Sequence, residues 1–186
     1  SKSMSEIKNY KIDFVSRTKD LLNENFADFK HKDKEVTFLL NCLLGLIVNV
    51  TENEKKSRLT FKGKIDDNFI SLLPDKVGFI IKKRHSKDLT DESAKIIETN
   101  IGHKSDLKSC DKFWFINKLR NGIAHQNIEG INEGKKWIGV RLWNTYNEEK
   151  DFEIIFNIEQ LKGLALRIAD DYLKNNKQPN EKKKTS

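Results

Sequence analysis

The sequence of 186 residues contains only two prolines and nine glycines. Chains built from many short strands need these residues at their turns, so their scarcity argues against a many-turned sandwich or barrel. The length suits one domain. We therefore expect an all-α or mainly α fold in a single domain over residues 5–176, followed by a disordered basic tail at residues 177–186.

Cysteine is equally scarce. Cys42 and Cys110 lie in or beside apolar stretches, without a CxxC or Cys/His spacing, so the sequence supports neither a disulfide framework nor a zinc site. This pattern fits a reducing, cytoplasmic location. A glycine-rich phosphate loop, paired metal-ligand histidines and a GxSxG elbow are also missing. We expect no metal and no cofactor.

Long hydrophobic runs are few. The longest, residues 36–50, falls short of the roughly 20 residues that a membrane span needs, and it contains Asn41 and Asn49. It predicts a buried helix and no membrane association. Because this helix is apolar nearly all round and has Gly45 at its middle, we expect it to pack closely against another helix or a partner subunit.

Charge, in contrast, is abundant and unbalanced. Lysine and arginine number 35 against 28 acidic residues, which gives a net charge of +7. A basic surface favours a polyanionic partner such as nucleic acid. Part of the excess lies in the lysines at 182–184 of the tail, which we interpret as a solvated end.

Apolar residues at helical spacing predict a first helix over residues 7–29. Threonine or serine followed by acids predicts two further helix starts, at Thr90 and at Ser105. The first of these helices should end near Gly102 and the second near Ala124. Residues 51–88 show no pattern that predicts their structure.

Two segments near the C-terminus alternate between apolar and polar residues. Residues 136–144 and 152–156 therefore predict a two-stranded hairpin, preceded by a turn that contains Gly130 and Gly134. Asn157 and Gln160 have the spacing of a capping box, which predicts a final helix from this point to about residue 176.

The segment 120–125 has the sequence RNGIAH and is the most informative part of the chain. An arginine and a histidine this far apart would occur about 0.4 times by chance, so the pair alone decides little. It stands, however, at the end of an aromatic-rich helix, and Asn121 follows Arg120 directly. The alternative is a C-terminal helix cap, in which Asn121 adopts the left-handed conformation and His125 or Arg120 meets terminal carbonyls.

The stretches KLRNGIAHQNIEGI (residues 118–131) and TFLLNCLLGLIV (residues 37–48) resemble the HEPN superfamily, in a bacterial, plasmid-encoded nuclease family. The resemblance implies a helical bundle with a small β-hairpin before the last helix. It also implies a homodimer that brings two Arg/His motifs into one cleft and cuts RNA without a metal. A toxin or phage-defence role is implied too, with an antitoxin or other regulatory protein as a partner. The alternative is a catalytically inactive HEPN module that binds a nucleotide or a partner.

The residue chemistry fits this activity independently. Cleavage of RNA by its own 2′-OH requires a base, an acid and a cation for the phosphorane charge. His125 suits acid/base work, Arg120 suits phosphate binding, and Asn121 suits orientation of the site. On a straight helix, however, Arg120 points about 140° away from His125. Two copies meeting at a dimer axis, or a helix that unwinds at Gly122, would bring the two side chains together.

Further basic residues are candidates for binding RNA. Lys82, Lys83 and Arg84 form a run that either follows an RNA backbone or is simply a solvated face. Arg141 shares one predicted strand face with Trp137 and Trp143. These side chains either stack on bases or pack against a neighbouring helix or subunit.

Overall fold

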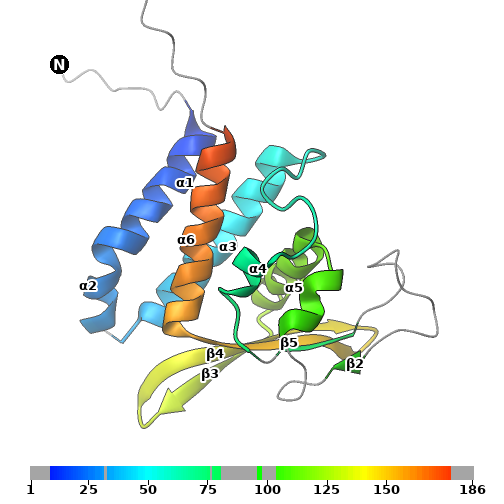
Figure 1. Ribbon diagram of the computed structural model, residues 1–186. Helices are drawn as coiled ribbons and strands as arrows, with labels where there is room; N and C mark the ends of the chain where they lie inside the picture. The colour runs from blue at the N-terminus through cyan, green and yellow to red at the C-terminus, as the bar shows by residue number, and fades with distance from the viewer. Residues whose placement is uncertain (1–8, 32, 76, 81–95, 98–103, 177–186) are drawn as a thin grey trace, which may run out of the picture.

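The computed structural model describes residues 9–31, 33–75, 77–80, 96–97 and 104–176. The helices lie on one side of an antiparallel sheet (Figure 1). The predicted tail at 177–186 lies outside the described residues, as does the basic run at 82–84. The described part of the chain thus has two layers, one helical and one of strands.

The first helical segment follows the prediction for residues 7–29. It consists of α1 (Tyr10–Asp20), a π-helical turn (Leu21–Asn25) and α2 (Phe26–His31), and α1 packs on α6 and α3. The apolar spacing explains the position of this helix, because Val15 and Leu22 face the core and are fully buried.

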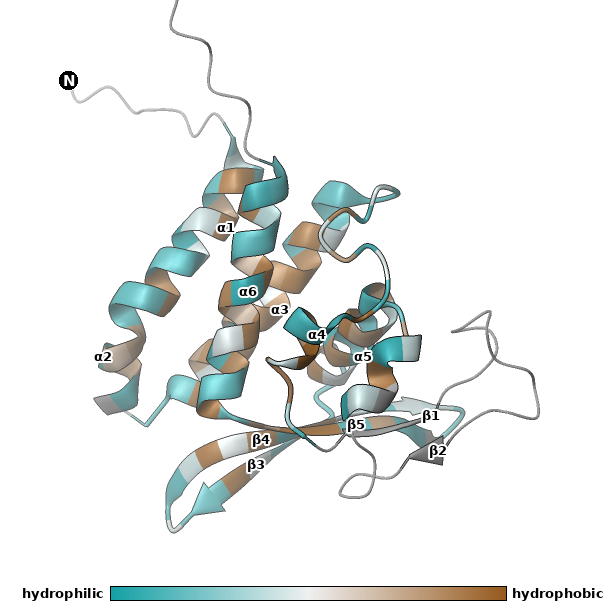
Figure 2. Ribbon diagram, in the orientation of Figure 1, coloured by the Kyte–Doolittle hydropathy of each residue, from teal (hydrophilic) through white to brown (hydrophobic). Residues whose placement is uncertain are grey.

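The long apolar helix α3 (Glu35–Glu54) lies at the centre of the helical layer. It packs on α1, α5 and α6, and Leu39, Leu43 and Leu46 are fully buried there. A Cβ placed on Gly45 would lie 3.4 Å from Cζ of Phe14, so the glycine is where α1 approaches. Within the described ranges, α3 is the one helix long and apolar enough to cross a membrane, and α1, α5 and α6 of this chain pack against it. Figure 2 shows the hydropathy of the residues along α3, which lies among the other helices.

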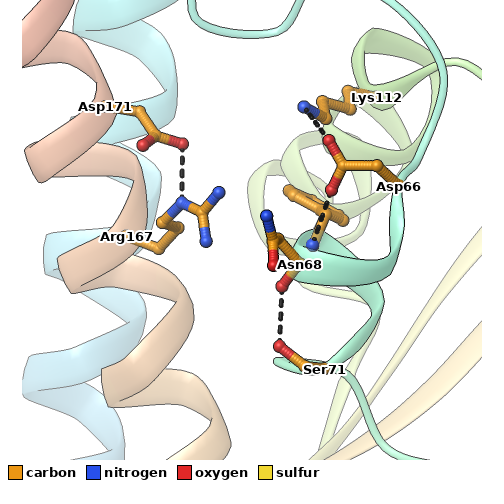
Figure 3. Close-up of polar contacts among 7 residues, drawn as sticks. Asp66, Asn68, Ser71, Lys112, Arg167 and Asp171 are labelled. Carbon is orange, nitrogen blue, oxygen red and sulfur yellow. Dashed lines mark hydrogen bonds and ion pairs between the residues drawn. The ribbon is translucent and has the colours of Figure 1, made fainter.

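The segment after α3 has an order that the sequence did not predict. The short helix α4 (Asp67–Ile70) begins at Asp66, whose carboxylate accepts the Phe69 N–H at 2.9 Å and an ion pair from Lys112 at 3.1 Å (Figure 3). The hydrogen bond from Phe69, with a smaller contribution from Lys112, lowers the pKa of Asp66. Asp66 therefore links this segment to the start of α5.

The sheet has five strands in the order β2-β1-β5-β4-β3, with all neighbours antiparallel. The predicted hairpin is present, and its strands pair Leu142 with Ile154. The strands in chain order are β1 (Val77–Ile80), β2 (Ile96–Ile97), β3 (Ile128–Glu133), β4 (Lys136–Tyr146) and β5 (Glu149–Asn157).

Two expectations about the sheet were wrong. The prediction of a turn around Gly130 was wrong, because this residue lies inside β3, where the Trp137 ring covers it. The prediction of a helix from Thr90 to Gly102 was also wrong where it can be tested, because Ile96 and Ile97 pair with β1. The remainder of that segment lies outside the described residues. The fold is therefore mainly helical with a sheet larger than a hairpin, and it is not all-α.

The last two helices frame the site. The prediction of one continuous helix from Ser105 was wrong, because a 3₁₀ helix (Lys104–Ser109) comes first and α5 (Lys112–Ala124) follows. The predicted capping box at the start of α6 (Ile158–Asn176) is confirmed. The Asn157 N–H donates to Oε1 of Gln160 at 2.9 Å, and the Gln160 N–H donates to Oδ1 of Asn157 at 2.8 Å.

Candidate functional site

The end of α5 is capped by the residues that follow His125. The Asn127 N–H donates to the Gly122 carbonyl at 2.8 Å, and the Gln126 N–H donates to the Ile123 carbonyl at 3.1 Å. Gln126 has a φ of 58°, so this residue, and not Asn121, adopts the left-handed conformation. These two bonds form a Schellman motif. The predicted alternative, a cap made by Asn121 and the His125 side chain, is therefore wrong, and both side chains remain available for other contacts.

A close approach between α5 and β4 fixes the position of this helix end. A Cβ on Gly122 would lie 2.8 Å from the Trp143 carbonyl oxygen, and the Trp143 N–H donates to the Asn127 carbonyl at 3.2 Å. Contact this close is available only to glycine. The end of α5 therefore lies directly over the second half of β4.

This contact creates a polar pocket of about 410 Å³. Its helix side consists of Lys118, Asn121 and His125, which share one face of α5 because they are three and four residues apart. His125 is exposed. The remaining lining residues come from the end of α5 and from β4: Asn127, Asn144, Thr145 and Tyr146.

A buried polar network forms one wall of the pocket. The Lys118 ammonium makes a very short ion pair with Oδ2 of Asp151, and Nδ2 of Asn144 donates to Oδ1 of the same carboxylate at 2.6 Å. All three side chains are less than a tenth exposed. The buried ammonium is stabilised by the Asp151 carboxylate, which in turn accepts the hydrogen bond from Asn144.

The position of Asp151 results from a β-bulge. Asn144 pairs with Phe152 whereas Thr145 pairs with Lys150, so Asp151 is the extra residue on β5. A bulge changes the direction of a side chain relative to the regular alternation. Asp151 therefore lies on the helix side of the sheet next to Phe152, where it reaches Lys118.

Arg120 does not line this pocket. The helix remains regular through Gly122 to Ala124, so the predicted unwinding at Gly122, one of two routes to bring Arg120 and His125 together, does not occur. Arg120 is half-buried. Within the described ranges, the side chains of Arg120, Asn121 and His125 make no hydrogen bond or ion pair.

Arg141 lies on the opposite face of the sheet. It alternates with buried Val140 and Leu142, and its Nη1 donates to Oε1 of Glu153 at 2.8 Å. The Glu153 hydrogen bond raises the pKa of Arg141, and Glu129 lies 3.5 Å from its Nε. Binding of substrate by Arg141 remains a prediction, with two acids that already offset its charge.

Trp137 was wrongly expected on the Arg141 face. Ile138 is an extra residue in the pairing of β4 with β3, so the alternation shifts there. Trp137 covers Gly130 and lines a pocket with Val36 and Thr37 of α3, on the helix side. Trp143 stays on the outer face, where the Lys150 ammonium lies 4.9 Å from its ring centroid.

In the described part of the chain, no group of three or more His, Cys, Asp or Glu side chains could hold a metal ion. The two cysteines are free and buried. Burial raises the pKa of Cys42 and of Cys110 to about 11, so both are protonated thiols at neutral pH.

Sequence reasoning found Asn121 and His125 but missed Lys118, Asn144 and Asp151. A signal for Lys118 was present, because this lysine stands three residues before Asn121 and seven before His125, which places all three on one face of a helix. Asn144 and Asp151 had no such signal, since their proximity depends on the bulge.

A family model described as HEPN pEK499 p136 matches residues 4–179. No curated protein and no solved structure matches the chain. The match includes the segment 120–125 and every described element, so the predicted resemblance to a HEPN family is confirmed.

Proposed function

The chain belongs to the HEPN pEK499 p136 family, and from this membership we propose that it is a metal-independent endoribonuclease. The observation that supports this most is the position of His125. It is exposed at the mouth of a polar pocket, and the helix end is capped without it. An imidazole so placed is accessible to a substrate and can act as a general acid or base.

The proposed reaction uses the substrate's own 2′-OH. A base removes the hydroxyl proton, the 2′-oxygen attacks phosphorus, and the bond from phosphorus to the 5′-oxygen breaks while an acid protonates that oxygen. The products are a 2′,3′-cyclic phosphate and a 5′-OH. His125 acts as the acid/base group, Arg120 binds the charged phosphorane, and Asn121 orients the reacting groups.

A homodimer is part of the proposal because Arg120 and His125 of the same chain point in different directions. With α5 regular, the two side chains point about 140° apart. Two copies of α5 meeting at an axis would place Arg120 of one protomer near His125 of the other. The apolar character of α3, which had also suggested a dimer, no longer supports one, because α1, α5 and α6 of the same chain cover it.

The biological role follows from the family alone. We propose a toxin or phage-defence effector that acts on RNA in the cytoplasm and that an antitoxin or other regulatory protein controls. The net charge of +7 supports an RNA substrate. The predicted basic run of Lys82, Lys83 and Arg84 would contribute to this attraction.

The product ends test the proposed reaction. The protein is incubated with total RNA in EDTA, and the fragments are treated with and without a phosphatase that removes only open phosphates. We expect cleavage to continue and the 3′ ends to resist the phosphatase until acid opens the cyclic phosphate. Cleavage that stops in EDTA, or that leaves a 3′-OH, would exclude this reaction.

One observation favours a second candidate. The separation of Arg120 from His125 within a chain is also what an inactive module that binds a nucleotide or a partner protein would show. Such a module would bind RNA or nucleotides and produce no fragments in either condition.

A further inference from the structure

A second pocket adjoins the His125 pocket along α5. It has a volume of about 310 Å³, and it shares Lys118 and Asn121 with the first pocket. Its other lining residues lie toward the start of α5 and in the segment after α3: Arg58, Asp111, Phe113, Trp114 and Asn117. Because Lys118 and Asn121 line both pockets, we refer to the two pockets together as the groove.

The outer end of this groove offers a stacking surface. The Arg58 guanidinium lies 3.8 Å from the centroid of the Phe113 ring. Arg58 has a φ of 46°, and the Phe61 N–H donates to its carbonyl at 3.0 Å, so a tight turn holds this arginine in place. Guanidinium planes and aromatic rings are the groups on which proteins stack unpaired bases.

Asn117 provides a polar group that can recognise a base. Its side chain makes no hydrogen bond or ion pair to the part of the chain that the structure describes. A carboxamide both donates and accepts hydrogen bonds, as the edges of the nucleobases do. The Asp111 carboxylate lies in the same pocket and disfavours a second phosphate there, which favours the neutral part of a nucleotide.

Lys118 is the residue of the groove that would contact a phosphate. An ammonium has three N–H donors, and in the described residues Asp151 is its hydrogen-bond partner. Lys118 lines both pockets. The ion pair with Asp151 holds the lysine in position.

We propose that this groove binds one dinucleotide step of single-stranded RNA, with the base of one nucleotide between Arg58 and Asn117 and its phosphate at Lys118. The other nucleotide occupies the His125 pocket. This assignment rests on the proposed function, since the phosphate of this dinucleotide step is the one that would be cleaved. It makes Arg58 and Asn117 determinants of base preference that lie outside the segment 120–125.

Binding of an uncleavable ligand tests the groove independently of cleavage. The probe is a dinucleoside monophosphate whose first sugar is 2′-deoxyribose, so that no 2′-OH can attack the phosphate. Its affinity is measured by NMR titration of the full chain. Asn117→Ala and Arg58→Ala are compared with Lys62→Ala, an exposed lysine of the same segment outside both pockets, which removes the same charge as the Arg58 variant.

We expect Asn117→Ala and Arg58→Ala to weaken binding by about tenfold, as loss of a base contact does, and Lys62→Ala to bind almost like wild type. Ribose 5-phosphate, which has no base, should bind the Asn117→Ala variant and wild type equally. Melting curves for each variant exclude misfolding. Equal affinity of all three variants for the probe, or no binding of the probe by wild type, would overturn the proposal that this groove binds RNA.

The outcome separates this inference from the proposed function. Base-dependent binding without any cleavage would support RNA binding in the groove and contradict the proposed nuclease activity. Cleavage that depends on His125 but is unaffected by Arg58→Ala and Asn117→Ala would keep the nuclease and reject the groove.

Discussion

Gly122 lies inside the motif, and its lack of a side chain sets the distance between α5 and β4. An added Cβ would come within 2.8 Å of the Trp143 carbonyl oxygen, which is backbone and cannot rotate away. The residues on both sides of this contact line the His125 pocket. Any shift of the helix end would therefore change the shape of the site.

Substitution of glycine should have opposite effects at Gly122 and Gly163. Alanine gains about 1 kcal/mol of helix propensity, but at Gly122 overpacking costs about 1 to 3 kcal/mol, so Gly122→Ala should be destabilised. In α6, nothing lies within 4 Å of a Cβ on Gly163, and Gly163→Ala should be stabilised by about 0.5 to 1 kcal/mol.

Urea unfolding of both variants measures these changes in free energy. If Gly122→Ala were as stable as wild type while Gly163→Ala gained stability, the close contact between α5 and β4 would not exist as described.

At the scale of elements, α1, α3 and α6 were predicted well because their signals are local. The apolar stripe of α1, the uniform apolarity of α3 and the capping box of α6 each lie within one segment. The hairpin of β4 and β5 also follows from alternation in neighbouring residues. These signals need no knowledge of the rest of the fold.

The elements that escaped prediction depend on distant partners. Strand β2 has only two residues and pairs with β1, and β3 contains Gly130, which becomes acceptable in a strand once Trp137 covers it. The same holds for the site. The side chains of α5 could be read from the sequence, whereas the contact of Asp151 with Lys118 depends on one bulge in β5.

The ion pair between Lys118 of α5 and Asp151 of β5 should respond differently to the loss of one charge and to the loss of both. Asp151→Ala leaves the Lys118 ammonium buried without its acid and should cost about 3 to 5 kcal/mol. The double variant Lys118→Met with Asp151→Leu removes both charges and should lose less than Asp151→Ala alone, because apolar side chains often replace a buried pair without loss.

Denaturant unfolding of the single and double variants provides the test. A double variant at least as unstable as Asp151→Ala would show that the two charges do not depend on each other.

At the scale of the whole molecule, the account requires two chains. Arg120→Ala and His125→Ala should each be inactive alone. When the two variants are mixed and allowed to exchange subunits, half of the dimers are mixed, and one of the two sites in each mixed dimer is intact. Activity should therefore return to roughly a quarter of wild type.

Sedimentation of wild type and of the mixture should show dimers in both cases. A strict monomer with full activity, or a mixture of dimers that stays inactive after exchange, would reject a site shared between protomers.

The central claim is that His125 cleaves RNA without a metal ion. Its most direct test compares wild type with His125→Ala on one RNA in EDTA, with matched melting curves to exclude misfolding. The account predicts that the variant loses about 10² to 10⁴ in rate, the range for a positioned acid/base group, and still binds the RNA. Equal cleavage by both proteins, or activity that appears only when Mg²⁺ is added, would contradict it.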